Sequence, residues 1–145
     1  MKILLSIKPE YSKKIFSGEK KYEFRKQKPK HIPELVIVYE SDPVQKIVGC
    51  FSVKRIISGS PKDIWERCKE SGGIREEDFF NYCGNKEIIY AFEIDKAQRF
   101  DSPIELLNLG FKIYPPQNFT YLNSSLFSKN IALLFAKAMY FALCP

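Results

Sequence analysis

The chain has 145 residues, of which 45% are hydrophobic and 28% are charged. This length fits one domain around a single hydrophobic core, and this composition excludes an intrinsically disordered protein. No apolar run reaches the roughly 18 to 20 residues that span a bilayer, and residues 1–8 are too short for a secretory signal. We therefore expect a cytoplasmic protein with no membrane partner.

The first elements predicted along the chain are a strand, a short helix and a second strand. Residues 2–8 form an apolar run typical of a strand, and Pro9 suits the first turn of a helix. Gly18 is placed to end that helix in a left-handed cap. In the strand over residues 21–25, aromatic and charged side chains alternate, so the charged ones are expected to face outward.

The middle of the chain predicts more strands and two more helices. Apolar runs predict strands over residues 35–39, 46–57 and 88–94. Gly49 marks a bulge or a close backbone approach in the second of these runs. Ser60 and Pro61 begin a helix that is interrupted at the glycine pair 72–73, and residues 75–82 predict another. Because the glycine pair lacks the spacing of a phosphate-binding loop, we expect no site there.

These elements follow one another without a regular strand–helix rhythm, which predicts an α+β fold with a small barrel or curled sheet. Residues 123–145 differ from the rest because they contain no acidic residue. Between residues 131 and 144 only Lys137 is charged, so this segment predicts an apolar C-terminal helix that must be buried. We expect it to pack on the domain or on a partner subunit in a homodimer.

Four cysteines and the single histidine, His31, are scattered along the chain. None of them forms a Cys-x-x-Cys pair or a Cys/His cluster, which structural zinc usually requires. We therefore expect no metal and no cofactor, and we interpret each cysteine as a small buried residue or a surface thiol.

The net charge of +6 is concentrated near the N-terminus. Residues 1–31 contain ten basic and three acidic residues, a balance of +7, whereas the remaining 13 basic and 14 acidic residues give −1. A localised basic surface suits a polyanion, because its association releases condensed counterions. A lysine-rich face that only aids solubility fits the same charge, and charge alone leaves both interpretations open.

Four residues near this basic region share a spacing that can carry chemistry. Gly18, Lys20, Glu23 and Arg25 follow the pattern G-x-K-x-x-E-x-R. Arginine can fork onto phosphate, glutamate can accept from a base amino group, and lysine can neutralise phosphate or act as a base when desolvated. The alternative is an exposed strand whose charges deter edge pairing, and spacing alone favours that alternative.

This stretch, with residues 6–9 before it, resembles the ASCH domains of the PUA-like superfamily, whose signature is the same G-x-K-x-x-E-x-R pattern. Residues 48–51 and 116–121 resemble a later barrel strand and the closing segment of that family. The likeness covers residues 1–122, and residues 123–145 would be a helical extension. It implies a small PUA-like β-barrel flanked by short helices, with RNA or a nucleotide as the partner.

As a binding module, such a domain would hold its ligand in a basic cleft around the signature. Lys8, Lys20 and Arg25 would contact phosphate or ribose, and Glu23 would read a base edge.

Residues outside the signature complete this hypothesis. Gln117 and Asn118 would hydrogen-bond a base, or they would only satisfy nearby backbone groups. Tyr22 or Tyr121 would stack on an unpaired base, or they would pack in the core.

The resemblance also implies enzyme activity as an alternative, because some ASCH domains are amidohydrolases that act on acetylated cytidine and others are linked to RNA cleavage. The amidohydrolase branch uses a lysine at the signature position, a threonine three residues later and a distant glutamate. Lys20 matches that lysine, but Glu23 replaces the threonine, so the mechanism does not carry over intact. If the protein is an enzyme, Lys20 and Glu23 are its catalytic candidates. A third hypothesis is a protein-interaction module that uses the apolar tail.

Overall fold

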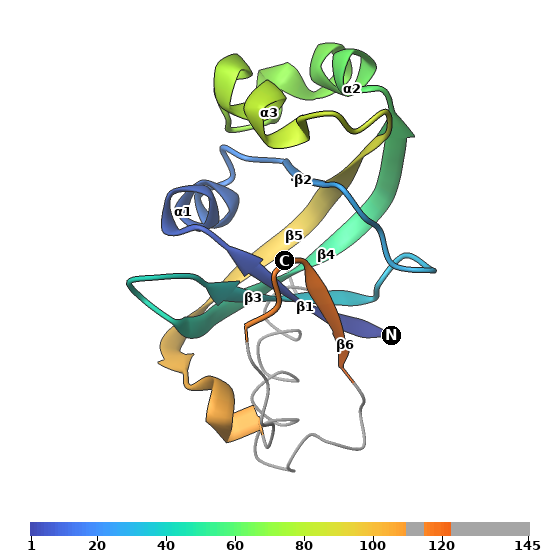
Figure 1. The fold of residues 1–145 in the computed structure, drawn as a ribbon. Coiled ribbons are helices and arrows are strands. Elements are labelled where there is room, and N and C mark those ends of the chain that lie inside the picture. The colour runs from blue at the N-terminus through green and yellow to red at the C-terminus, as the bar shows by residue number, and fades with distance from the viewer. Residues whose placement is uncertain (110–114, 123–145) are drawn as a thin grey trace.

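One curled six-stranded sheet forms the centre of the molecule in the computed structural model, which describes residues 1–109 and 115–122 (Figure 1). The strands are β1 (Lys2–Ile7), β2 (Tyr22–Arg25), β3 (Leu35–Glu40), β4 (Lys46–Gly59), β5 (Ile89–Ile104) and β6 (Phe119–Leu122). The helices are α1 (Pro9–Ser17), α2 (Pro61–Cys68) and α3 (Glu76–Cys83), with single 3-10 turns at Lys69–Ser71 and Leu106–Leu109. This architecture confirms the predicted α+β fold.

The strand order in the sheet is β2-β5-β4-β3-β1-β6, so β2 and β6 form its two edges. β1 and β3 are parallel, and the other neighbouring strands are antiparallel. Curling brings the two edges close enough for Arg25 at the end of β2 to reach the backbone beside β6. Its Nη1 lies 3.5 Å from the carbonyl oxygen of Asn118. The sheet is therefore a half-barrel whose opening is bridged by a side chain.

β4 and β5 form a long antiparallel pair that follows the curl of the sheet (Figure 1). β5 continues about ten residues beyond the predicted strand, because its backbone still pairs with β4 there. The apolar pattern did not predict this extension, since its second half is polar and largely exposed. The pairing register shifts between Ile47 and Gly49, where the sheet bends against α1. A Cβ atom on Gly49 would lie 2.6 Å from the Phe16 ring of α1, which explains why a glycine occupies this position.

Helix ends follow the sequence signals. Gly18 ends α1 with φ of +86°, and the Ser60 hydroxyl accepts a hydrogen bond of 3.2 Å from the Asp63 amide at the start of α2. α2 and α3 lie together in the β4–β5 connection, at the top of Figure 1. Trp65 and Phe79 from these helices pack with Phe24 of β2. This aromatic contact fixes β2 against the helical layer.

Three of the four cysteines, Cys50, Cys68 and Cys83, are buried as free thiols. No helix within residues 1–109 and 115–122 is long and apolar enough to cross a membrane. The predicted C-terminal helix over residues 123–145, its packing and its proposed role in a homodimer lie outside the described residues.

Replacing Gly49 with alanine should lower the free energy of unfolding by about 1–3 kcal/mol, because the new methyl group overlaps the Phe16 ring and the Gln98 carbonyl oxygen. Urea unfolding followed by circular dichroism measures this difference. Gly59→Ala is the matched control, since the nearest atom to its new methyl group lies 3.6 Å away. Equal stability of the two variants would contradict the close approach of α1 to β4.

Candidate functional site

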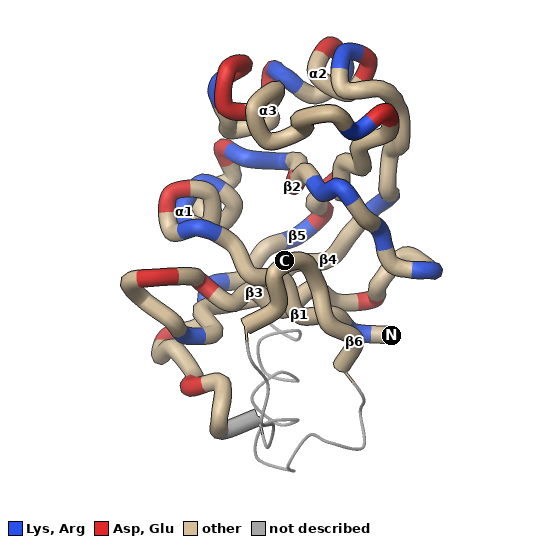
Figure 2. The backbone as a smooth tube through the Cα atoms, in the orientation of Figure 1, with Lys and Arg blue, Asp and Glu red and all other residues tan. Residues whose placement is uncertain are grey.

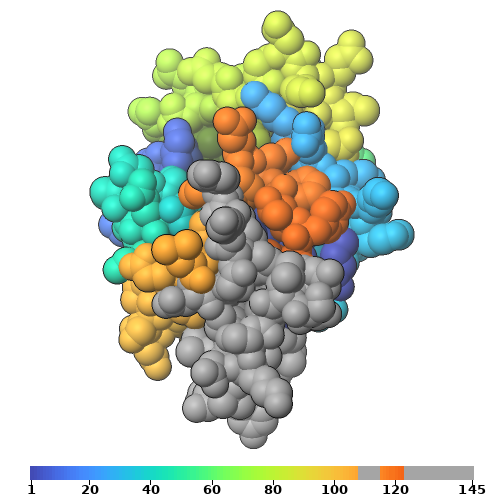
Figure 3. All heavy atoms as spheres, turned by 60° about the horizontal axis from the view of Figure 1, so that its bottom comes forward, coloured from blue at the N-terminus to red at the C-terminus, as the bar shows by residue number. Residues whose placement is uncertain are grey.

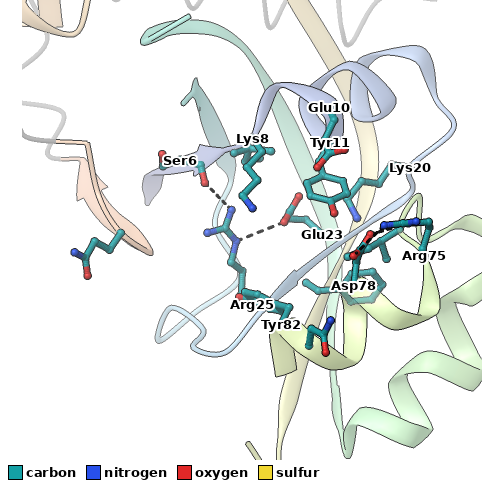
Figure 4. Close-up of a pocket in the computed structure, with 15 residues that line it drawn as sticks. Ser6, Lys8, Glu10, Tyr11, Lys20, Glu23, Arg25, Arg75, Asp78 and Tyr82 are labelled. Atoms are coloured by element: carbon teal, nitrogen blue, oxygen red, sulfur yellow. Dashed lines mark hydrogen bonds and ion pairs between the residues drawn. The ribbon is translucent and has the colours of Figure 1, made fainter. Parts of the chain in front are cut away.

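A pocket of about 700 Å³ opens beside β2, where the end of β1, the first turn of α1 and α3 converge (Figure 4). Its lining includes Lys8, Tyr11, Lys20, Glu23, Arg25, Arg75, Asp78, Asn81, Tyr82 and Gln117. The side chains of Lys8, Tyr11, Glu23 and Arg25 point into the same space in Figure 4. The pocket therefore gathers groups that are far apart in the sequence.

Most of the residues predicted for the site lie on this pocket. Lys8, Lys20, Glu23, Arg25 and Gln117 all line it. Tyr121 does not: it lies on β6, and its hydroxyl accepts a hydrogen bond of 3.0 Å from the backbone amide of Lys30.

The other two polar or aromatic candidates are also outside the pocket lining. Tyr22 packs against the aromatic cluster formed by β2, α2 and α3. The Asn118 side chain donates a hydrogen bond of 2.8 Å to Gln27, which links the segment before β6 to the loop after β2.

Lys20 is buried, with 2% of its surface exposed. Its ammonium group donates a hydrogen bond of 2.6 Å to the Gly72 carbonyl and lies 4.7 Å from the centre of the Phe24 ring. Desolvation lowers the pKa of this amine, and the carboxylate of Glu23 opposes that shift in part. Lys20 is consequently easier to deprotonate than an ordinary lysine.

We expected no site at the glycine pair 72–73, but these two residues contact Lys20 directly. Gly73 has φ of +64°, and a Cβ atom there would lie 2.7 Å from the Cβ of Lys20. The carbonyl of Gly73 also accepts a hydrogen bond of 3.2 Å from Lys14. The sequence does contain a signal for this contact, namely the two adjacent glycines. A glycine can mark a close approach of two backbones, as it does at Gly49.

The charged side chains of β2 were expected to face outward, but the structure buries them. Glu23 and Arg25 are 7% and 8% exposed, and Oε1 of Glu23 lies 3.6 Å from Nε of Arg25. The reason is that the curl of the sheet brings β1 and the segment before β6 next to Arg25, while α1 and α3 form the other walls of the pocket. Arg25 also donates a hydrogen bond of 2.9 Å from Nη2 to the Ser6 carbonyl.

Two atoms of this buried pair lack a hydrogen-bond partner within the described residues. They are Oε2 of Glu23 and Nε of Arg25, an acceptor and a donor. A buried polar atom without a partner destabilises a fold by about 1–3 kcal/mol, so such atoms are rare in native structures. Oε2 of Glu23 therefore has the capacity to accept one further hydrogen bond, and Nε of Arg25 the capacity to donate one.

Sequence reasoning missed the walls that α1 and α3 contribute. Tyr11 comes from α1, while Arg75, Asp78, Asn81 and Tyr82 come from α3 or its first turn. Arg75 and Asp78 pair at 2.9 Å across one helical turn. Their spacing of three is visible in the sequence, but nothing in the sequence places α3 beside β2.

The charge of the pocket is mixed. Four cationic side chains line it, namely Lys8, Lys20, Arg25 and Arg75, together with three carboxylates, namely Glu10, Glu23 and Asp78. Two of the cations already face carboxylates, because Arg25 faces Glu23 and Arg75 faces Asp78. The excess positive charge of residues 1–31 therefore lies largely outside this pocket.

One family model and several known proteins match this chain. The model of the ASCH domain matches residues 5–104. An ASCH domain-containing ribonuclease of Zymomonas mobilis is 28% identical over 139 residues, and the match covers 90% of both chains. The ATP synthase subunit alpha of Ureaplasma parvum is 29% identical over 121 residues, but the match spans only 15% of that protein.

Solved structures show the same fold. The crystal structure of ASCH from Zymomonas mobilis superposes with a TM-score of 0.81 at 25% identity, covering 94% of each chain. A tyrosine-to-phenylalanine mutant of that protein gives a TM-score of 0.82 at 26% identity, covering 91% of this chain and 97% of the other.

Burial of Lys20 should make stability depend on pH in a defined direction. Because its folded-state pKa is lowered, the charged amine destabilises the fold fully below that pKa and no longer does so above the unfolded value. Relative to Lys20→Met, the wild type should gain stability as the pH rises from 7 toward the ordinary lysine pKa of about 10.4, with a slope of at most about 1.4 kcal/mol per pH unit.

Urea unfolding at several pH values measures this difference. Lys21→Met removes the exposed neighbouring lysine and serves as the control. A stability difference between wild type and Lys20→Met that stays constant over this range would show that Lys20 does not titrate as a desolvated amine.

Proposed function

The chain belongs to the ASCH domain family, and we propose that it binds RNA, or a nucleotide unit of RNA, in the pocket beside β2. The relative that matches over nine-tenths of both chains is named a ribonuclease, which supports an RNA-related function. A volume of about 700 Å³ is within the range of small-ligand sites. The mixture of cations and carboxylates suits a ligand that carries both a phosphate and hydrogen-bonding base edges.

The observation that carries this proposal is the unpartnered pair of buried atoms on Glu23 and Arg25. Oε2 of Glu23 can accept a hydrogen bond from a base amino group, and Nε of Arg25 can donate to a phosphate or ribose oxygen. Lys8 is exposed at the mouth and points into the same space, so it can neutralise the phosphate (Figure 4). Gln117 lines the pocket as a further hydrogen-bonding group.

The aromatic contact to a base comes from residues other than Tyr22 and Tyr121 in this proposal. Tyr11 and Tyr82 both line the pocket, and Tyr82 is 37% exposed. A ring at the mouth of a pocket can stack on an unpaired base, as in many complexes with single-stranded RNA.

A second candidate function is cleavage of the bound RNA, and the environment of Lys20 favours it. Lys20 is a buried amine with a lowered pKa that lines the same pocket as Glu23, and these properties suit a general base. In RNA cleavage the base would take the proton of the 2′-hydroxyl, whose oxygen attacks phosphorus while the bond to the 5′-oxygen breaks. The leaving oxygen then takes a proton, and the hydroxyl of Tyr11, which lines the pocket, would donate it.

The same groups also suit hydrolysis of acetylated cytidine. There the general base would take a proton from water, whose oxygen adds to the acetyl carbonyl carbon. The bond from that carbon to the cytosine nitrogen then breaks, the nitrogen takes the proton, and acetate is released. The two reactions differ in product, so one substrate panel separates them.

Glu23→Gln and Arg25→Lys should each weaken binding of a single-stranded 12-nucleotide RNA by about 10- to 100-fold, because a charge-assisted hydrogen bond contributes about 1.5–3 kcal/mol. Fluorescence anisotropy at a fixed salt concentration measures the affinity. Arg67→Lys on the exposed face of α2 is the matched control. Since Arg25 also joins two sheet edges, the melting temperature of each variant is recorded. Unchanged affinity in both pocket variants would remove this site.

For the hydrolytic candidate, RNA and acetylated cytidine are incubated with wild type, Lys20→Met and Lys21→Met, and products are separated by chromatography. Turnover should fall at least 100-fold in Lys20→Met and stay unchanged in Lys21→Met. If the wild type forms no product from any substrate, the catalytic candidate is wrong and only the binding function is retained.

A further inference from the structure

The loop between β2 and β3 holds positive charge that the pocket does not contain. Lys26, Lys28, Lys30 and His31 lie within six residues, and no acidic residue lies among them. Figure 2 shows these basic positions following one another along the chain after β2. The ion pairs found in the described residues involve other cations, so the three lysine ammonium groups are unpaired in that part of the chain.

This loop is fixed in place, which an ordinary solvating lysine segment does not require. Pro29 and Pro33 are buried, and they alternate with exposed lysines and His31. The backbone amide of Lys30 donates a hydrogen bond of 3.0 Å to the Tyr121 hydroxyl, and the Gln27 side chain accepts one of 2.8 Å from Asn118. Figure 3 shows the light-blue loop beside the orange segment that contains β6. A surface ordered in advance binds with a smaller loss of conformational entropy.

Aromatic rings lie among the lysines and connect the loop to the pocket. The Lys26 ammonium is 4.9 Å from the centre of the Tyr82 ring, and that ring lines the pocket. The Lys28 ammonium is 5.7 Å from the Tyr90 ring. Beyond Lys30, Tyr121 is 45% exposed. From the pocket mouth to β6, the half-buried Lys26 and the exposed Lys28 and Lys30 therefore lie near tyrosine rings.

We propose that this surface, formed by Lys26, Lys28, Lys30, Tyr82 and Tyr121 and called the basic track below, binds the part of a single-stranded RNA that continues beyond the nucleotide in the pocket. The inference rests on the proposed function of the pocket and extends it to the substrate class, a chain of several nucleotides. The lysines contact successive phosphates, and the tyrosines stack on unpaired bases. Tyr121 does not line the pocket, and in this proposal it stacks on a base of the RNA that lies beyond the pocket.

Two features favour a single strand over other polyanions. Exposed rings beside the cations are useful only if bases are unstacked, and a duplex keeps its bases paired. The track also begins at a pocket of nucleotide size, whereas a lipid surface needs no such pocket. Duplex RNA and anionic vesicles are therefore the competing ligands in the test.

The test compares two triple variants with the same change in charge. Lys26→Gln, Lys28→Gln and Lys30→Gln together remove the track cations, and Lys54→Gln, Lys62→Gln and Lys96→Gln remove three exposed lysines elsewhere. Affinity is measured by fluorescence anisotropy for a 12-nucleotide single strand, and by competition for the four nucleoside monophosphates. The same RNA annealed to its complement and phosphatidylserine vesicles complete the set of ligands.

The track variant should bind the 12-nucleotide strand at least about tenfold more weakly than wild type at 100 mM salt, with its logarithmic salt slope reduced by about 2, since each phosphate contact on a single strand contributes about 0.7. Its affinity for monophosphates should stay unchanged, and the control variant should remain within about threefold of wild type. Melting temperatures of both triple variants verify folding.

Several results would overturn the inference, and they are separable from failure of the pocket. Equal loss in the two triple variants, or equal affinity of wild type for duplex and single strand, would overturn the track while Glu23→Gln still weakens binding. Loss of vesicle binding without loss of RNA affinity would overturn it in the same way. If RNA affinity falls in the track variant but not in Glu23→Gln, the basic track is supported and the proposed role of the pocket is wrong. Absence of any RNA binding by wild type would overturn both.

Discussion

Arg25 links the two edges of the curled sheet, and both the fold and the pocket depend on that link. Its guanidinium donates hydrogen bonds to the carbonyl groups of Ser6 in β1 and Asn118 before β6. The same group faces Glu23 across 3.6 Å. Because one side chain closes the half-barrel and forms the pocket wall, the shape of the pocket is set by the curvature of the sheet.

Burying three charged side chains next to one another destabilises the fold unless their polar atoms find partners. Lys20 finds the Gly72 carbonyl, whereas Glu23 and Arg25 keep one unpartnered atom each within the described residues. In the proposed function, the ligand would supply the missing hydrogen bonds. The pocket then selects one unit of the ligand, and the unpaired cations of the basic track contribute attraction that does not depend on sequence.

Local signals in the sequence were sufficient for the elements and for the signature residues. Pro9, Gly18 and Ser60 mark helix ends through their own backbone chemistry, and alternation in the strand over residues 21–25 separates Phe24 from its charged neighbours. Burial of those charges could not be predicted, because it depends on the curl of the sheet, which brings β1 and the segment before β6 next to Arg25. The walls from α3 and the role of the glycine pair 72–73 depend on the same long-range packing.

The most direct measurement is a crystal structure of the protein with a short single-stranded RNA. The account predicts one nucleotide in the pocket, with a base or sugar group within hydrogen-bond distance of Oε2 of Glu23 and a phosphate or ribose oxygen near Nε of Arg25. RNA bound on another face, with no RNA atom within hydrogen-bond distance of these two atoms, would contradict it.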